Sequence, residues 1–116
     1  MRNLIILLIT LFSVNANAQD AEVYVKQGVT KHDNQDYRGA IIDCTKAIEL
    51  DPDYAEALFV RASSKVYLKD YRGSILDCTK AIELNPEYGM AYFVRGASKI
   101  MLGDTDGGCL DYSKAG

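Results

Sequence analysis

The sequence has little of the chemistry that enzymes and metal proteins need. It contains one histidine, three cysteines and two prolines in 116 residues. With His32 alone, a metal site built on two histidines is excluded. The cysteines are 34 and 31 residues apart, so no paired-cysteine zinc or redox motif is present. No Gly-x-Ser-x-Gly motif, phosphate-binding loop or paired-carboxylate cleft can be identified. We therefore expect no enzyme, no cofactor and no metal site.

Long apolar runs are also scarce, and the only one lies at the N-terminus. Arg2 is followed by a mostly apolar stretch over residues 4–14, and then by Ala16-Asn17-Ala18. A short apolar run that ends in small residues at these positions is typical of a cleaved signal peptide. A membrane anchor is the alternative, but a stretch of about 11 residues is much shorter than the ~20 that a spanning helix needs. We expect cleavage after Ala18 and a periplasmic or secreted protein with no membrane span.

Positive charge is not in excess either. Without residues 1–18, 12 basic residues face 16 acidic ones, a formal net charge of −4. This balance gives no attraction to nucleic acid or to an anionic membrane. The remaining 19–116 segment is long enough for one domain with a modest core.

What the sequence does contain is an internal repeat. Residues 37–52 and 71–86 are identical at thirteen of sixteen positions, at an offset of 34. The same offset relates residues 57–81 to residues 91–115, which makes a third, partial copy. Each copy contains two stretches of helical period, residues 55–69 and 71–84 in the second copy. Pro52 and Pro86 follow the second stretch and end it. Gly103 can adopt the left-handed conformation between the last two helices.

These features resemble the tetratricopeptide repeats, a family with a period of 34 residues and two helices per repeat. The large residue of the first helix, the small residue four places later and the closing proline all fall at matching positions. The large residues are Tyr24, Leu58 and Tyr92, the small residues are Gly28, Ala62 and Gly96, and the closing prolines are Pro52 and Pro86. The resemblance implies an all-α, right-handed solenoid of about 2.5–3 antiparallel helix pairs, of an exported bacterial type. The repeats would span about residues 21–54, 55–88 and 89–116, the last one incomplete.

Departures from the family pattern suggest ion pairs. Arg61 and Arg95 stand where the family has leucine. Each is followed by an aspartate on the next helix at the same spacing, Asp77 after Arg61 and Asp111 after Arg95. We predict that each arginine pairs with its aspartate, at about 0–1 kcal/mol if the pair is exposed. In the first copy, a glutamine at position 27 would give Asp43 a weaker, neutral partner.

We expect the cysteines and the histidine to have structural roles. Cys44 and Cys78 are expected to be buried apolar residues, because equivalent points on stacked helices are too far apart for a disulfide. A Cys78–Cys109 disulfide stays open as an alternative. His32 is expected to cap carbonyl groups or to face solvent. The acidic stretch over residues 104–111 lacks the ligand spacing of a calcium loop.

The resemblance further implies a partner-binding groove lined by the first helix of each repeat. The positions that it assigns to partner binding are Val25, Val29, Phe59, Val66, Tyr67, Met90, Phe93, Ile100 and Met101. This groove becomes more apolar toward the C-terminus. A core location for Phe59, Phe93 and Tyr67 is the alternative, since helical spacing alone cannot orient a stripe. The family's carboxylate-binding clamp maps onto apolar residues, namely Val25, Val29, Val60, Met90 and Val94, so a chaperone C-terminus is not the expected ligand.

Three functional hypotheses follow. The first is a non-catalytic adaptor that binds a protein or peptide partner in the groove. The second is a structural subunit that self-associates through its third repeat, because repeat arrays bury apolar faces only against neighbours and no capping helix is visible. The third, an enzyme, would need catalytic groups beyond Gly116.

Overall fold

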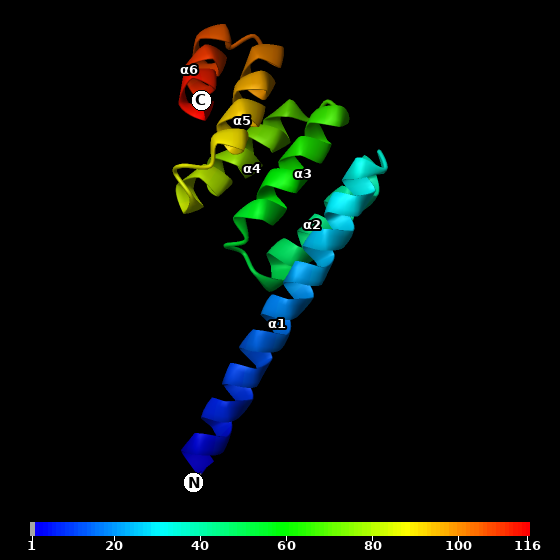
Figure 1. The fold of residues 1–116 in the computed structure, drawn as a ribbon, viewed down its shortest axis with the longest axis vertical. Helices are drawn as coiled ribbons and strands as arrows, with labels where there is room; N and C mark the ends of the chain where they lie inside the picture. Colours follow the sequence, from blue (N-terminus) through cyan, green and yellow to red (C-terminus); the bar gives the residue numbers. More distant parts are fainter. Residues whose placement is uncertain (1) are drawn as a thin grey trace.

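The protein is described by a computed structural model that covers residues 2–116, with side chains from residue 17 onward. The described residues form six helices and no strand (Figure 1). The helices are α1 (Arg2–Asp33), α2 (Tyr37–Leu50), α3 (Ala55–Tyr67), α4 (Tyr71–Leu84), α5 (Gly89–Met101) and α6 (Thr105–Ala115). Consecutive helices pack as antiparallel pairs and the pairs stack along the chain. The predicted all-α solenoid is confirmed.

The first helix is longer than the repeat requires. α1 begins at Arg2 and continues without a break through the predicted signal peptide. Residue 1 and the side chains of residues 2–16 lie outside the described part, so the signal peptide stays a prediction. Within the described residues, no helix combines the length and the apolar character that crossing a membrane demands.

A repeated Asp-x-x-Gly motif starts the second helix of every pair. Asp36, Asp70 and Asp104 are the N-cap residues, and each carboxylate accepts a hydrogen bond from the backbone N–H of the glycine three places later, at 2.9–3.0 Å. A Cβ atom on that glycine would collide with the capping carboxylate. The motif therefore satisfies one of the free N–H groups at each helix start. The residue before the cap adopts positive φ at Lys69 (64°) and Gly103 (94°), so the left-handed conformation predicted for Gly103 is confirmed.

Small residues allow the two helices of a pair to approach closely. A Cβ atom on Gly96 would lie 2.8 Å from the backbone oxygen of Gly108 and 2.9 Å from Cδ1 of Tyr112. In the first pair, a Cβ atom on Gly28 would lie 2.6 Å from Sγ of Cys44. Tyr112 occupies the position that cysteine occupies in the first two pairs, and Gly96 makes room for its larger ring, while Gly108 makes room for the side chain of Ile100. The close approach of the two helices is therefore the reason for the small residues at these positions.

The interfaces between pairs form two small apolar clusters. One contains Val25, Ala47 and Ala57, and the other contains Leu58, Ala81 and Ala91. Each cluster joins residues of three helices, so a helix pair is completed by the pair that follows it.

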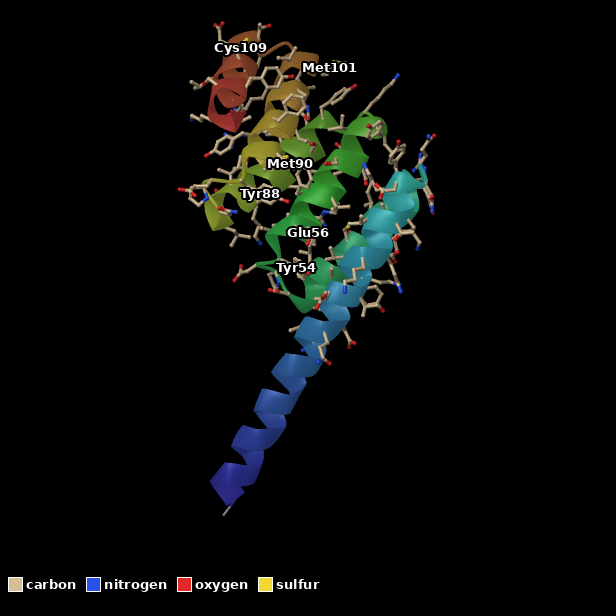
Figure 2. The ribbon with its side chains drawn as sticks, in the orientation of Figure 1. Tyr54, Glu56, Tyr88, Met90, Met101 and Cys109 are labelled. Carbon is tan, nitrogen blue, oxygen red and sulfur yellow. The ribbon has the colours of Figure 1, made fainter. Side chains whose placement is uncertain are left out.

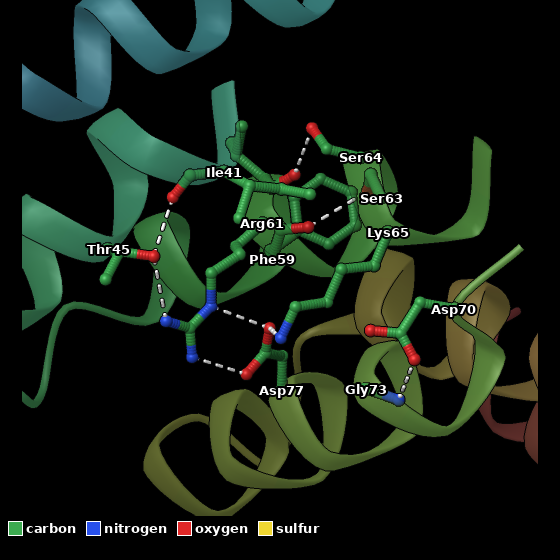
Figure 3. A network of polar contacts seen from close by, with 11 residues as sticks. Ile41, Thr45, Phe59, Arg61, Ser63, Ser64, Lys65, Asp70, Gly73 and Asp77 are labelled. Carbon is green, nitrogen blue, oxygen red and sulfur yellow. Dashed lines mark hydrogen bonds and ion pairs between the residues drawn. The ribbon is translucent and has the colours of Figure 1, made fainter. Parts of the chain in front are cut away.

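A buried aspartate on the second helix ties together each pair. In the second pair, Asp77 accepts hydrogen bonds from Nε and Nη2 of Arg61 at 2.8 and 2.7 Å, and from Nζ of Lys65 at 2.9 Å (Figure 3). Arg61 also donates to Oγ1 of Thr45 on α2, at 3.2 Å. The arginine therefore links one pair to the next. Because Asp77 is only 5% exposed, removing one partner of this bridge would cost more than breaking the exposed pair considered from the sequence.

The third pair repeats this arrangement. Arg95 donates to Asp111 through two bonds of 2.8 Å, and Nζ of Lys99 lies 3.0 Å from the same carboxylate. Burial alone would raise the pKa of Asp111, but the hydrogen bonds from Arg95 and Lys99 outweigh burial and lower the pKa below its usual value. The carboxylate therefore stays charged at neutral pH. The predicted Arg61–Asp77 and Arg95–Asp111 pairs are confirmed.

The first pair corrects one expectation. Gln27 is exposed and does not bond to Asp43; instead Nζ of Lys31 lies 2.7 Å from Oδ2 of Asp43, as an ion pair. Lys31 stands in the same repeat position as Lys65 and Lys99. The prediction of a neutral partner was wrong because it compared only the arginine position and not the lysine one turn later.

We predict that Asp77→Ala lowers the free energy of unfolding by about 3 kcal/mol, because Arg61 and Lys65 would keep partly buried charges without a partner. Denaturant titration monitored by helical circular dichroism would measure the change. Glu83→Ala, on the exposed face of the same helix, is the matched control and should change stability by less than about 0.5 kcal/mol. Equal stability of the two variants would contradict the prediction.

Candidate functional site

The first helices of the three pairs share one face of the molecule. α3 contacts both α1 and α5, and these three helices lie side by side in Figure 1. Three hollows follow one another along their surface, with volumes of 350, 390 and 240 Å³ from the first pair to the third. Neighbouring hollows share residues: Val29 and Glu56 line the first two, and His32 and Ser63 line the last two. We call this continuous depression the odd-helix groove.

The groove changes in character along its length. The first hollow includes Glu22, Lys26 and Glu56, and the middle one includes Asp33 and Glu56. The third hollow contains no acidic or lysine side chain and is lined by His32, Ser63, Val66, Tyr67, Phe93, Val94 and Ala97. An apolar C-terminal end of the groove agrees with the gradient read from the sequence.

Most of the predicted partner-binding residues reach the groove. Seven of the nine line its hollows, namely Val25, Val29, Phe59, Val66, Tyr67, Met90 and Phe93. Tyr67, Met90 and Phe93 are 61%, 63% and 57% exposed, so the core alternative does not apply to Tyr67 or Phe93. Phe59 is intermediate, because it packs on the Leu58 cluster and also lines the middle hollow. Whether these side chains bind a partner stays a prediction.

Three predicted residues offer the groove little or no surface. Val25 belongs to the core at 2% exposure and offers the first hollow almost no surface. Ile100 turns toward α6, where its side chain lies in the space that a Cβ atom on Gly108 would occupy. Met101 is 61% exposed but lines none of the three hollows. Its helix ends at that residue, beyond the last hollow.

His32 has a different role from the one expected. Its Nδ1 atom lies 2.9 Å from Oγ of Ser64, and that hydroxyl donates to the carbonyl oxygen of Val60 at 3.0 Å. His32 and Ser64 therefore form a side-chain hydrogen bond between α1 and α3. The ring also meets Tyr37 and Tyr67 edge-on, at centroid distances of 5.3 and 5.6 Å. The histidine thus joins α1 to α3 rather than capping carbonyls or facing solvent.

The sequence pattern did not predict this aromatic cluster. Tyr37 and Tyr67 stack in parallel with centroids 4.4 Å apart, and the first starts α2 while the second ends α3. Tyr71 is the equivalent of Tyr37 in the second repeat. The pattern within one repeat, however, does not indicate that Tyr37 contacts Tyr67 of the next repeat. The cluster could have been predicted from the positions of its rings, since His32 is near the end of α1, Tyr37 is at the start of α2 and Tyr67 is at the end of α3.

The three cysteines differ in exposure. Cys44 and Cys78 are fully buried, and burial raises the pKa of each thiol to about 12, so both stay protonated. Cys109 is exposed and all three are free, so a Cys78–Cys109 disulfide is not formed. The described side chains include no group of histidine, cysteine or acidic residues placed to hold a metal ion.

A solenoid of antiparallel helix pairs with a groove over its first helices defines a class of helical repeat proteins. The family model for the tetratricopeptide repeat matches residues 21–54 and 55–88. The chain belongs to the tetratricopeptide-repeat family. Domains of this family act as protein-interaction modules, and the chain is such a module. No curated protein sequence matched it.

Solved structures of the same family superimpose closely. The TPR domain of Arabidopsis OM64 is 25% identical with a TM-score of 0.84, over 85% of this chain and 82% of that one. The first TPR domain of Spaghetti (RPAP3), bound to the HSP90 peptide SRMEEVD, is 31% identical with a TM-score of 0.82, over 84% and 78%. The TPR2B domain in a pHsp70 complex of yeast Sti1 is 25% identical with a TM-score of 0.81, over 84% and 78%.

Proposed function

We propose that the chain is a non-catalytic adaptor that holds a peptide segment of a partner protein in the odd-helix groove. The observation that carries this proposal is the set of large apolar side chains exposed along one continuous depression. Phe93, Met90 and Tyr67 are each more than half exposed there. Exposed apolar surface in a groove is typical of a protein-binding site, and methionine adapts to varied side chains. Related domains solved with peptides support the same use of the fold.

The ligand differs in chemistry from the peptide bound by the Spaghetti domain. SRMEEVD is acidic and ends in a carboxylate. In this chain the positions that correspond to the carboxylate clamp are all apolar, and two of them, Val25 and Val60, are only 2% and 7% exposed. None of these five apolar side chains can bind a terminal carboxylate. An extended or helical apolar segment is the better fit.

We expect Phe93→Asp to reduce partner binding by more than tenfold, since it places a charge in the apolar third hollow. Affinity capture from the exported fraction of the source cells, with quantified partner bands, would measure the loss. Leu76→Asp is the matched control: Leu76 is 72% exposed on α4, away from the groove. Both variants should keep the helical circular dichroism of the parent. Undiminished capture by Phe93→Asp would refute the groove as the binding site.

Self-association is a second candidate, favoured by the exposed apolar side chains of the third pair. Met101, Leu102 and Leu110 are 61%, 45% and 57% exposed there. If this surface joins two copies, sedimentation velocity should show a species that grows with concentration, and Met101→Glu should return it to monomer. A single monomeric species at the highest attainable concentration would remove this candidate.

We also propose that the chain is exported and loses residues 1–18. The basic residue at position 2, the apolar run and the small residues Ala16 and Ala18 support this. Expressed from its full sequence in a secreting bacterium, the protein should be recovered outside the cytoplasm with Gln19 as its first residue, as mass spectrometry would show. Ala18→Phe should block cleavage. Recovery of only the uncleaved, cytoplasmic chain from the parent would contradict export.

A further inference from the structure

The middle hollow of the odd-helix groove combines two carboxylates with aromatic rings. Asp33 is the last residue of α1, and Glu56 lies in the first turn of α3. Phe59 and Tyr88 line the same hollow, with ring centroids 5.3 Å apart. Figure 2 shows Tyr54 and Glu56 at the start of α3, and Tyr88 and Met90 at the start of α5. The hollow measures 390 Å³, enough for one long side chain of a partner.

Neither carboxylate of this hollow is neutralised by the protein itself. Among the described side chains, the structural aspartates at 43, 77 and 111 all pair with lysine or arginine, and Glu22 pairs with Lys26 at 2.9 Å. Asp33 and Glu56 form no ion pair or hydrogen bond within that part of the chain. The middle hollow therefore has a negative charge that no lysine or arginine of the described residues pairs with.

The position of Asp33 is unfavourable for the fold alone. A carboxylate at the C-terminal end of a helix faces the negative end of the helix dipole, which destabilises it. Glu56, at the start of α3, has the opposite and favourable placement, so helix stability explains Glu56 but not Asp33. A ligand cation between the two would interact favourably with both.

The aromatic rings add to this preference. The face of a phenyl or phenol ring attracts a cation, and the attraction strengthens when the site is partly shielded from water. Burial and the negative charge of Glu56 raise the pKa of Tyr88 to about 12, so its hydroxyl stays neutral. Two carboxylates, two rings and a neutral hydroxyl are a suitable environment for a guanidinium or ammonium group.

We propose that the partner segment carries an arginine or lysine side chain that enters the middle hollow between Asp33 and Glu56, next to a large apolar side chain that packs on Phe93 in the third hollow. The two hollows share His32 and Ser63, so one short segment can fill both. This inference rests on the proposed peptide-binding function and specifies its ligand. It predicts a ligand of the opposite charge to SRMEEVD.

A random-peptide library displayed on phage, selected on the purified full chain, tests the ligand chemistry. We expect the selected peptides to combine a basic residue with a neighbouring large apolar one. Fluorescently labelled synthetic copies would then be titrated by anisotropy, alongside copies in which the basic residue is replaced by glutamate. Glu56→Arg should weaken binding of the basic copies by about tenfold or more. Added salt should weaken binding to the parent chain.

Glu83→Arg is the matched control, because it makes the same charge change on the exposed surface of α4. It should leave the affinity within about twofold of the parent. Peptides that need Phe93 but lack a basic residue, or that bind equally well to Glu56→Arg, would overturn this inference and leave the proposed function standing. Failure to select any peptide, or binding unaffected by Phe93→Asp, would overturn both.

Discussion

Each helix pair depends on a carboxylate held inside it. An isolated buried charge would be very costly, so Asp77 and Asp111 are compatible with the fold only because an arginine and a lysine reach them from the preceding helix. The planar guanidinium binds both oxygens of the carboxylate and thereby fixes the distance and the rotation between the two helices. Arg61 and Arg95 also bond to the threonine of the previous pair, so the same group sets the geometry within and between repeats.

That geometry determines where the groove lies. Because the second helix of each pair is fixed against the first, the opposite side of α1, α3 and α5 is left open to solvent. Phe93 and Met90 are exposed there for this reason, although helical spacing would also allow them to be core residues. Val25, two pairs earlier at the position equivalent to Phe93, is covered by Ala47 and Ala57 and belongs to the core. The solvent-exposed face of α1, α3 and α5 is thus determined by how the helices of each pair pack together, and not by the residues that line this face.

The sequence predicted the architecture well because the 34-residue period is a strong signal. Thirteen identities in sixteen positions, with proline and glycine at the expected helix ends, define the pairs without any packing calculation. The Arg61–Asp77 and Arg95–Asp111 pairs were predicted because both partners recur at the same offset. The Lys31–Asp43 pair was missed because only the arginine position was compared, and the His32–Tyr37–Tyr67 cluster was missed because its members come from two different repeats. The orientation of the apolar stripe could not be predicted at all, since it depends on how neighbouring helices rotate.

Gly96 has a consequence for how readily a ligand is captured. Its missing side chain lets Tyr112 lean across α5, where its ring stacks on Phe93 with centroids 5.2 Å apart. A phenyl ring supported in this way loses little rotational freedom when another molecule packs against it. The entropy cost of ordering Phe93 is therefore met largely during folding, and association is left with a smaller penalty.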